Sequence, residues 1–280
     1  RINSSIVVES NNSKSSISSS LKTLSKKDIT AICSSGCSNF SSSSCSNSNT
    51  IVKTSYIAKL SLLEFSESDC DLKITWTSCC RPGTWDDYFL SVNFNKCVDG
   101  VNHSPKIIND PYHIIAPNEP YSYSWKAIDE DGDSLVYELV EAKLSAEKSF
   151  YYEKGLNYKN PFSYVGYPQS SAKFPKGFHF DDRNGLLRFY PTKTMSAPIS
   201  AKITEYRKGV KIGESIREVT MTVDNINNKK PIVTGINGGN KESITDCIGQ
   251  ELCFNIQAED INEDDLIELE WTTDVPNATI

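Results

Sequence analysis

The amino-acid sequence predicts an all-β protein made of β-sandwich domains in series. Short segments in which apolar and polar residues alternate recur along the chain, for example at residues 72–76, 88–94 and 135–139. This period of two is typical of strands with one buried face. Gly and Asn turns separate the segments, and no window has the periodicity of an amphipathic helix. Many short strands joined by such turns indicate β-sandwiches.

An internal repeat indicates that the domains are arranged in tandem. Residues 119–139 read EPYSYSWK followed by AIDEDGDSLVYEL, and residues 250–270 read QELCFNIQ followed by AEDINEDDLIELE. The two stretches align without a gap. Two copies of one unit in a single chain predict an array of similar modules.

Three domains are expected. Residues 1–100 form a disulfide-rich β-sandwich that is incomplete at its N-terminus, residues 101–226 a second β-sandwich, and residues 227–280 the incomplete start of another. Asn102 and Asn228 each lie three residues before a proline, where the backbone is held extended and Asn tolerates unusual angles, so these positions suit domain joints. We expect the chain to be a fragment of a longer protein.

The first fifty residues give two conflicting signals. Their Ser- and Asn-rich composition is by itself typical of a disordered linker. Three cysteines in the same stretch favour a cross-linked, loop-rich region instead, with short strands at residues 6–8 and 29–32.

Composition excludes several classes of function. The net charge of -7 argues against nucleic-acid partners and against an anionic membrane surface. No run of eighteen apolar residues is present, so the sequence predicts no membrane-spanning helix. No catalytic motif is present either, and the carboxylate pairs Asp86–Asp87 and Asp181–Asp182 are adjacent residues that would face opposite ways on a strand. We expect the protein not to be an enzyme.

The cysteines predict a location outside the cytoplasm. There are nine of them, without paired Cys-x-x-Cys knuckles or nearby histidines, which favours disulfides over zinc. The odd number leaves one thiol free or paired outside the chain. The candidate disulfide residues are Cys33, Cys37, Cys45, Cys70, Cys79, Cys80, Cys97, Cys247 and Cys253.

Two pairs of these cysteines allow a more specific expectation. Neighbouring side chains on a strand point to opposite faces, so Cys79 and Cys80 are expected to bond to two different partners, for which Cys70 and Cys97 are available. Cys247 and Cys253 lie six residues apart around Gly249, which favours a local disulfide.

A carboxylate-dense turn precedes the strand at 135–139. Its aspartates are close enough to repel one another strongly, so the turn is either fully solvated or built around a hard cation such as calcium. The spacing is not that of an EF-hand. The candidate calcium ligands are Asp129, Asp131 and Asp133, with Asp260, Asn262 and Asp264 at the matching positions of the second copy. Glu205 either reaches the first site or pairs with Arg217 across strands.

A long loop from about Lys143 to Lys176 interrupts the strand pattern. Loops of this length are usually functional or disordered. Its aromatic residues either form a platform for a glycan or another surface, or cover the open end of a sandwich, and covering is the favoured interpretation. The candidate ligand-loop residues are Tyr151, Tyr152, Tyr158, Tyr164 and Tyr167.

Several phrases resemble a known family. ITWTSCCR (74–81), DEDGDSLVY (129–137), NGLLRF (184–189) and EYRKGVKIG (205–213) resemble the large repetitive surface proteins of gliding Bacteroidetes, over about residues 6–223 and in the same order. The resemblance implies tandem immunoglobulin-like and cadherin-like domains, export by the type IX secretion system and a role as a cell-surface adhesin. The cadherin-like resemblance also implies calcium that stiffens the joints between domains. The family's C-terminal sorting domain is absent from this sequence.

Together, these observations predict a segment of an extracellular, multidomain adhesin or filament with a spacer and attachment role. The resemblance implies that this role belongs to gliding motility. The expected partners are cell-surface or secretion-machinery proteins, surface glycans and neighbouring repeats of the same chain. The alternatives are a carbohydrate-binding accessory module of a secreted polysaccharide-degrading enzyme, with the Tyr-rich loop on the sugar, and a cargo domain held by a secretion machine.

Overall fold

The computed structural model describes residues 5–28, 52–226, 231–239 and 252–260. The chain divides into two compact units. The first comprises Arg1–Ile32 and Asn47–Asn225, and the second comprises Cys33–Ser46 and Ile226–Ile280. Strands dominate the first unit and nearly all their pairings are antiparallel, which confirms the predicted all-β class.

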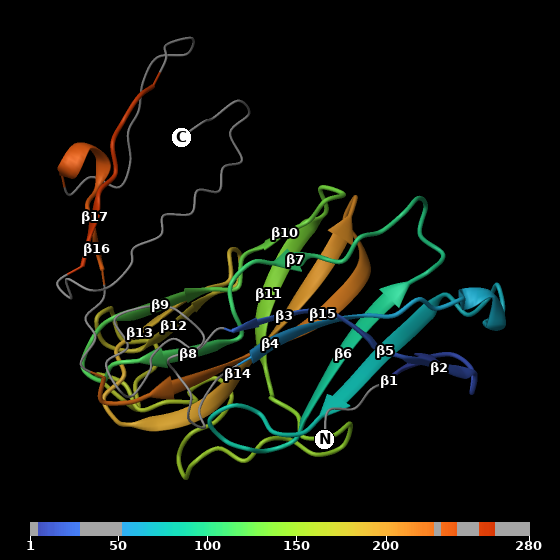
Figure 1. Ribbon diagram of the computed structural model, residues 1–280, viewed down its shortest axis with the longest axis horizontal. Helices are drawn as coiled ribbons and strands as arrows, with labels where there is room; N and C mark the ends of the chain where they lie inside the picture. The colour runs from blue at the N-terminus through green and yellow to red at the C-terminus, as the bar shows by residue number, and fades with distance from the viewer. Residues whose placement is uncertain (1–4, 29–51, 227–230, 240–251, 261–280) are drawn as a thin grey trace. The chain divides into compact units, whose positions relative to one another are not determined.

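The main sheet of the first unit has eight strands (Figure 1). Seven of them follow in the order β11 (Ser134–Val140), β14 (Met195–Arg207), β15 (Val210–Val223), β6 (Tyr88–Asn95), β5 (Asp71–Ser78), β1 (Ser5–Ser10) and β2 (Ser16–Ser20). The eighth, β8 (Tyr112–Ile115), runs parallel to the C-terminal half of β15. The alternating segments at 72–76, 88–94 and 135–139 are therefore strands, as predicted.

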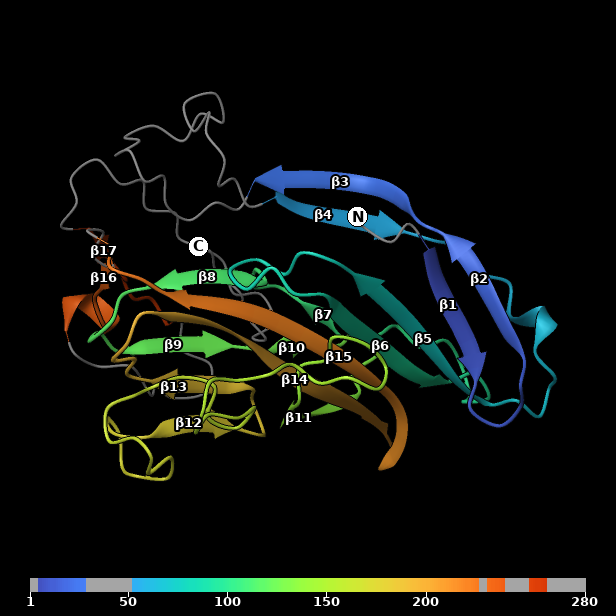
Figure 2. The same cartoon turned by 90° about the horizontal axis from the view of Figure 1, so that it is seen from below.

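A three-stranded sheet faces the core on the other side (Figure 2). It contains β12 (Phe178–Asp181), β13 (Leu186–Phe189) and β9 (Tyr121–Ser124). Asn184-Gly185 makes the predicted hairpin turn between β12 and β13. Gly185 has φ +68°, and an added Cβ would lie 2.9 Å from Tyr137 Cδ1, so glycine is required there both by conformation and by packing.

Short pairs complete the described chain. They are β3 (Lys22–Asp28) with β4 (Val52–Ile57), β7 (Lys106–Ile107) with β10 (Ala127–Ile128), and, in the second unit, β16 (Ile232–Val233) with β17 (Ala258–Glu259). Two 3₁₀ turns lie at Leu62–Glu64 and Ile236–Gly238. None of the helical segments in these described ranges is long and apolar enough to cross a membrane.

Composition alone does not reveal β2 and β3, which lie in the Ser-rich N-terminal stretch. The sequence of β2 is SISSS, yet it pairs with β1 over five residues. Backbone hydrogen bonds make this ladder, so only one side chain, Ile17, has to pack against apolar neighbours. The expected strand at residues 6–8 lies within β1, whereas the one at 29–32 falls outside the described residues.

The described residues of the first unit form two separate hydrophobic clusters. The larger one lies between the main sheet and the three-stranded sheet, and Trp125, Leu187 and Ile199 within it are completely buried. The smaller one is formed by Val8, Phe65 and Leu72 near the N-terminal strands. Each cluster corresponds to one of the first two expected domains.

The same two regions are nevertheless joined by one continuous sheet. Strand β15 pairs with β6 at three positions, Gly213↔Phe94, Glu214↔Asn93 and Ser215↔Val92. Both regions belong to one compact unit, whose second segment ends at Asn225. The division into domains at residues 101 and 227, and their immunoglobulin-like or cadherin-like character, stay predictions.

Candidate cation site

The turn between β10 and β11 gathers the three predicted aspartates. Asp129 Oδ1 accepts hydrogen bonds from the backbone N–H groups of Asp131 and Asp133, each 3.0 Å long, and Gly132 between them has φ +77°. This local folding brings one carboxylate oxygen from each aspartate within 4.8 Å of the others. The predicted proximity of the three carboxylates is thus present in the structure.

Strand β14 adds a fourth carboxylate, that of Glu205. This residue pairs with Leu135 of β11 and is only 1% exposed. Gly213 lies opposite it on β15, where an added Cβ would be 2.7 Å from Glu205 Oε1, so glycine leaves the room that this side chain occupies. Burial raises the pKa of Glu205, and the negative charges of the three aspartates raise it further against the lowering effect of a hydrogen bond from Asn102.

Of the two sequence-based interpretations of Glu205, the cross-strand pair with Arg217 is wrong, whereas a direct role in the cation site stays a prediction. Arg217 pairs across the strands with Ala201 instead, and its Nη2 donates to the carbonyl of Asn109. A one-residue difference in strand position decides which side chains meet across a sheet, and sequence spacing alone does not give that register.

Arg207 is the main positive charge at the site. Its guanidinium donates to both carboxylate oxygens of Asp133, at 2.9 and 2.7 Å, and lies 3.3 Å from Asp131. It also donates to the carbonyls of Asp99 and Val101, at 3.2 Å each. One side chain therefore connects the acidic turn to the segment that follows β6.

Asn102 and His103 of that segment complete the connection. Asn102 Nδ2 donates to Glu205 Oε2 at 3.0 Å, and its Oδ1 accepts from Arg207 at 2.9 Å. The backbone N–H of His103 donates to Asp131 at 2.6 Å, and its ring Nδ1 lies 2.9 Å from the same carboxylate. The hydrogen bond and charge of Asp131 raise the pKa of His103, while His103 lowers the pKa of Asp131.

The donor set fits a hard divalent cation. Three aspartate carboxylates lie together, Glu205 adds negative charge nearby, and Arg207 is the one permanent positive charge that the described contacts bring to them. Asp129 Oδ2 is buried, and no hydrogen-bond donor among the described residues reaches it. Calcium takes six to eight oxygen ligands of this kind. Asp129, Asp131 and Asp133 are the residues that would hold it.

The second predicted turn lies mostly outside the described residues. Asp260 is the last described residue there, and Asn262 and Asp264 fall outside the described residues.

The described cysteines differ from expectation at one point. Cys70 and Cys97 form a disulfide, with their Cα atoms 5.2 Å apart. Cys79 and Cys80 are bonded to each other, so the expectation of two separate partners is wrong. That expectation assumed a regular strand, but β5 ends at Ser78 and Cys80 has φ +74°, which allows the two side chains to meet. Cys33, Cys37, Cys45 and Cys247 lie outside the described residues, so the pairing of Cys247 with Cys253 stays a prediction.

The tyrosines of the aromatic loop lie in two different environments. Tyr164 is 2% exposed and, with Phe162, lies in the larger hydrophobic cluster, as the covering interpretation predicted. Tyr151, Tyr152 and Tyr158 instead line a surface hollow, and Tyr151 is 86% exposed. The hydroxyl of Tyr167 donates to the carbonyl of Gly155, which closes the loop on itself.

Sequence reasoning missed Asn102, His103 and Arg207 as parts of the cation site. The Asn-x-x-Pro pattern marked Asn102 only as a joint, and residues 205–213 were identified as part of the resemblance. Comparison with known proteins finds no matching family model, no similar curated protein and no similar solved structure. The fold and the site together define an all-β protein. In it, hydrogen bonds connect an acidic turn to the segment that joins two hydrophobic clusters.

Proposed function

We propose that this chain is a segment of a secreted, multidomain cell-surface adhesin or filament, similar to the repetitive surface proteins of gliding Bacteroidetes. Its role is mechanical. Rigid modules in series hold a distal attachment surface away from the cell, outside the cytoplasm, and their partners are cell-surface or secretion-machinery proteins and neighbouring repeats.

The observation that carries the proposal is that side chains of other elements hold the segment at residues 99–103 in place. Side chains of Arg207, Asp131 and Glu205 contact its backbone or its side chains directly. A spacer needs such fixed joints because any freely rotating joint would let it fold back. The Cys70–Cys97 disulfide supports a location in an oxidising compartment, and the repeat of the acidic turn at 258–270 supports a series of modules.

Calcium at the acidic turn would strengthen this joint. It would be held by Asp129, Asp131 and Asp133, and it would offset the repulsion between carboxylates that Arg207 leaves uncompensated. His103 contacts Asp131, and Arg207 bridges Asn102 and Asp133, so fixing these carboxylates also fixes the segment.

Thermal unfolding in calcium and in a chelator tests the proposal. At a calcium concentration about 100 times the Kd, binding to the folded state adds about 2.7 kcal/mol, which corresponds to a rise in Tm of roughly 5 to 10 °C for a unit of this size. Asp129→Asn should abolish the rise. Glu153→Gln, which changes an exposed carboxylate on the aromatic loop, should keep it.

Two results would contradict a calcium-stiffened joint. One is an unchanged Tm at millimolar calcium. The other is the same rise in Asp129→Asn as in the parent chain, which would place the bound ion elsewhere.

A further inference from the structure

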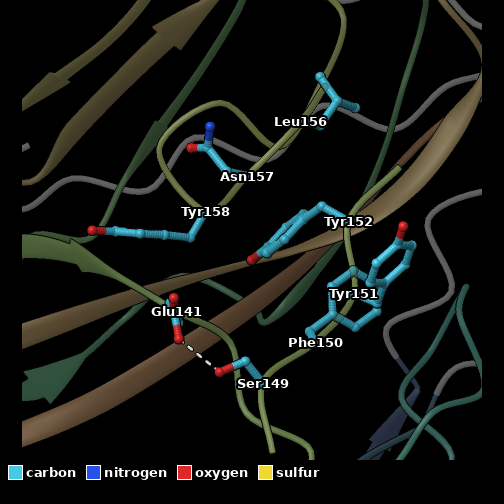
Figure 3. A pocket seen from close by; sticks show the side chains of 8 residues that line it. All are labelled: Glu141, Ser149, Phe150, Tyr151, Tyr152, Leu156, Asn157 and Tyr158. Atoms are coloured by element: carbon cyan, nitrogen blue, oxygen red, sulfur yellow. Dashed lines mark hydrogen bonds between the residues drawn. The ribbon is translucent and has the colours of Figure 1, made fainter. Parts of the chain in front are cut away.

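The long loop between β11 and β12 forms a surface hollow of about 220 Å³ that is separate from the cation site (Figure 3). Its lining comes entirely from residues 141–158. The lining residues are Glu141, Ser149, Phe150, Tyr151, Tyr152, Leu156, Asn157 and Tyr158. Half of them are aromatic, so the hollow combines flat apolar walls with a few polar groups.

The aromatic walls are held in place by contacts beneath them. The hydroxyl of Tyr152 donates to the carbonyl of Pro198 on β14 at 3.2 Å, and its ring packs edge-on against Phe150 with centroids 4.9 Å apart. The guanidinium of Arg81 lies 5.2 Å from the centre of the Phe150 ring. These rings are therefore anchored to the main sheet before any ligand arrives, which lowers the entropy cost of binding.

The side chain of Tyr151 is exposed and is not part of either hydrophobic cluster. Its side chain is 86% exposed at the rim of the hollow, next to rings that are partly buried. A large aromatic ring left in water beside a preformed hollow is typical of a binding surface.

Two polar groups are oriented by neighbours. Glu141 accepts hydrogen bonds from Ser149 Oγ at 2.6 Å and from Lys143 Nζ at 3.4 Å, both on Oε2. These bonds lower the pKa of Glu141, so it is ionised at neutral pH and keeps Oε1 as an acceptor. Asn157 Oδ1 accepts from the backbone N–H of Lys159, which orients its amide and keeps Nδ2 as a donor. In Figure 3 the Tyr158 ring lies between Asn157 and Glu141.

We propose that this hollow binds one neutral pyranose ring of a saccharide. The C–H groups on one face of such a ring carry the partial positive charge that the negative face of an aromatic ring attracts. Its hydroxyls both donate and accept, so they match the Glu141 carboxylate and the Asn157 amide. The volume lies below the roughly 300 Å³ at which pockets for drug-sized ligands begin, which suits a single ring.

The negative charge in the hollow limits the class of sugar that we expect to bind there. Glu141 is the one charged residue that lines the hollow within the described part of the chain. Lys143 contacts only Oε2 of this carboxylate, so an acidic sugar, such as a uronate, would place its own carboxylate against the negative charge at Oε1. The site therefore prefers neutral hexoses to acidic ones.

Titration of the full chain with saccharides tests the proposal. Short neutral oligosaccharides and oligouronates are titrated separately, and binding is followed by two-dimensional NMR. We expect a neutral sugar to bind with a Kd of about 1 mM, typical of a small site with few contacts, and to shift the amide signals of residues 141–158. Tyr151→Ala and Glu141→Gln should each weaken binding about tenfold.

The controls separate this proposal from the spacer function. Glu153→Gln alters the same loop outside the hollow and should bind like the parent chain. Tyr151 is so exposed that its removal should leave the Tm and its calcium response unchanged. The proposal is overturned if no sugar binds, if binding is unaffected in both Tyr151→Ala and Glu141→Gln, or if oligouronates bind as tightly as neutral sugars.

Discussion

At the scale of single residues, the positively charged side chain of Arg81 is buried. Its side chain is 1% exposed, and it donates to both carboxylate oxygens of Glu218, at 2.6 and 3.2 Å. Nη2 also donates to the carbonyl of Lys143, and Glu218 accepts from Ser200. A buried pair of this kind adds little net stability over an apolar replacement, but losing one partner leaves an uncompensated buried charge.

Arg81→Met should therefore lower the free energy of unfolding by about 3 to 5 kcal/mol. Lys193→Met is the matched control, because Lys193 pairs with Glu153 at an exposed position and its loss should cost less than about 1 kcal/mol. Urea unfolding followed by Trp fluorescence measures both. Equal losses in the two variants would mean that burial does not govern the energy of the Arg81 pair.

At the scale of elements, the segment between β6 and β7 is held by side chains of other elements. His103 is its titratable contact with the acidic turn. Because Asp131 raises the pKa of His103 in the folded protein, protonation of this histidine favours the folded state. Its contribution is complete below the unfolded pKa of about 6.5 and disappears as the pH rises through the raised folded pKa.

His103→Gln should therefore lower the Tm more at a pH of about 6 than at a pH of about 9. The pKa of His103, read from its ring signals by NMR, should lie above the usual value in the parent chain. In Asp131→Asn it should fall back towards that value. A variant whose Tm differs from the parent equally at both pH values would rule out this titration.

At the scale of the whole molecule, the first compact unit couples two hydrophobic clusters. The β6–β15 pairing and the Arg81–Glu218 ion pair connect them. Cutting the chain between the clusters would expose the edge of β15 that pairs with β6. It would also leave Glu218 without its partner Arg81. The two regions should therefore stabilise each other.

A fragment of residues 101–226 should have a lower Tm than the same residues within the full chain. The lost ion pair alone accounts for about 3 kcal/mol, which corresponds to roughly 5 °C or more in a domain of this size. Differential scanning calorimetry of the fragment and the full chain gives the comparison. Identical Tm values would instead show that the two regions are independent domains, as the sequence predicts.

Local sequence signals predicted much of the strand pattern and part of the site. Alternating apolar residues located β5, β6 and β11, and Asn184-Gly185 located the β12–β13 hairpin, because each signal depends on near neighbours. The acidic turn was predicted for the same reason: Asp129 caps the backbone of residues two and four positions further on.

The sequence by itself thus determined an all-β chain with a carboxylate-rich turn. Only the tertiary structure decided which distant side chains meet, such as Arg81 and Glu218, which lie 137 positions apart, or Asn102 and Glu205, 103 apart. These contacts depend on strand register and on burial. Both result from packing across the whole unit, and a shift of one residue in register would turn Glu205 away from the acidic turn.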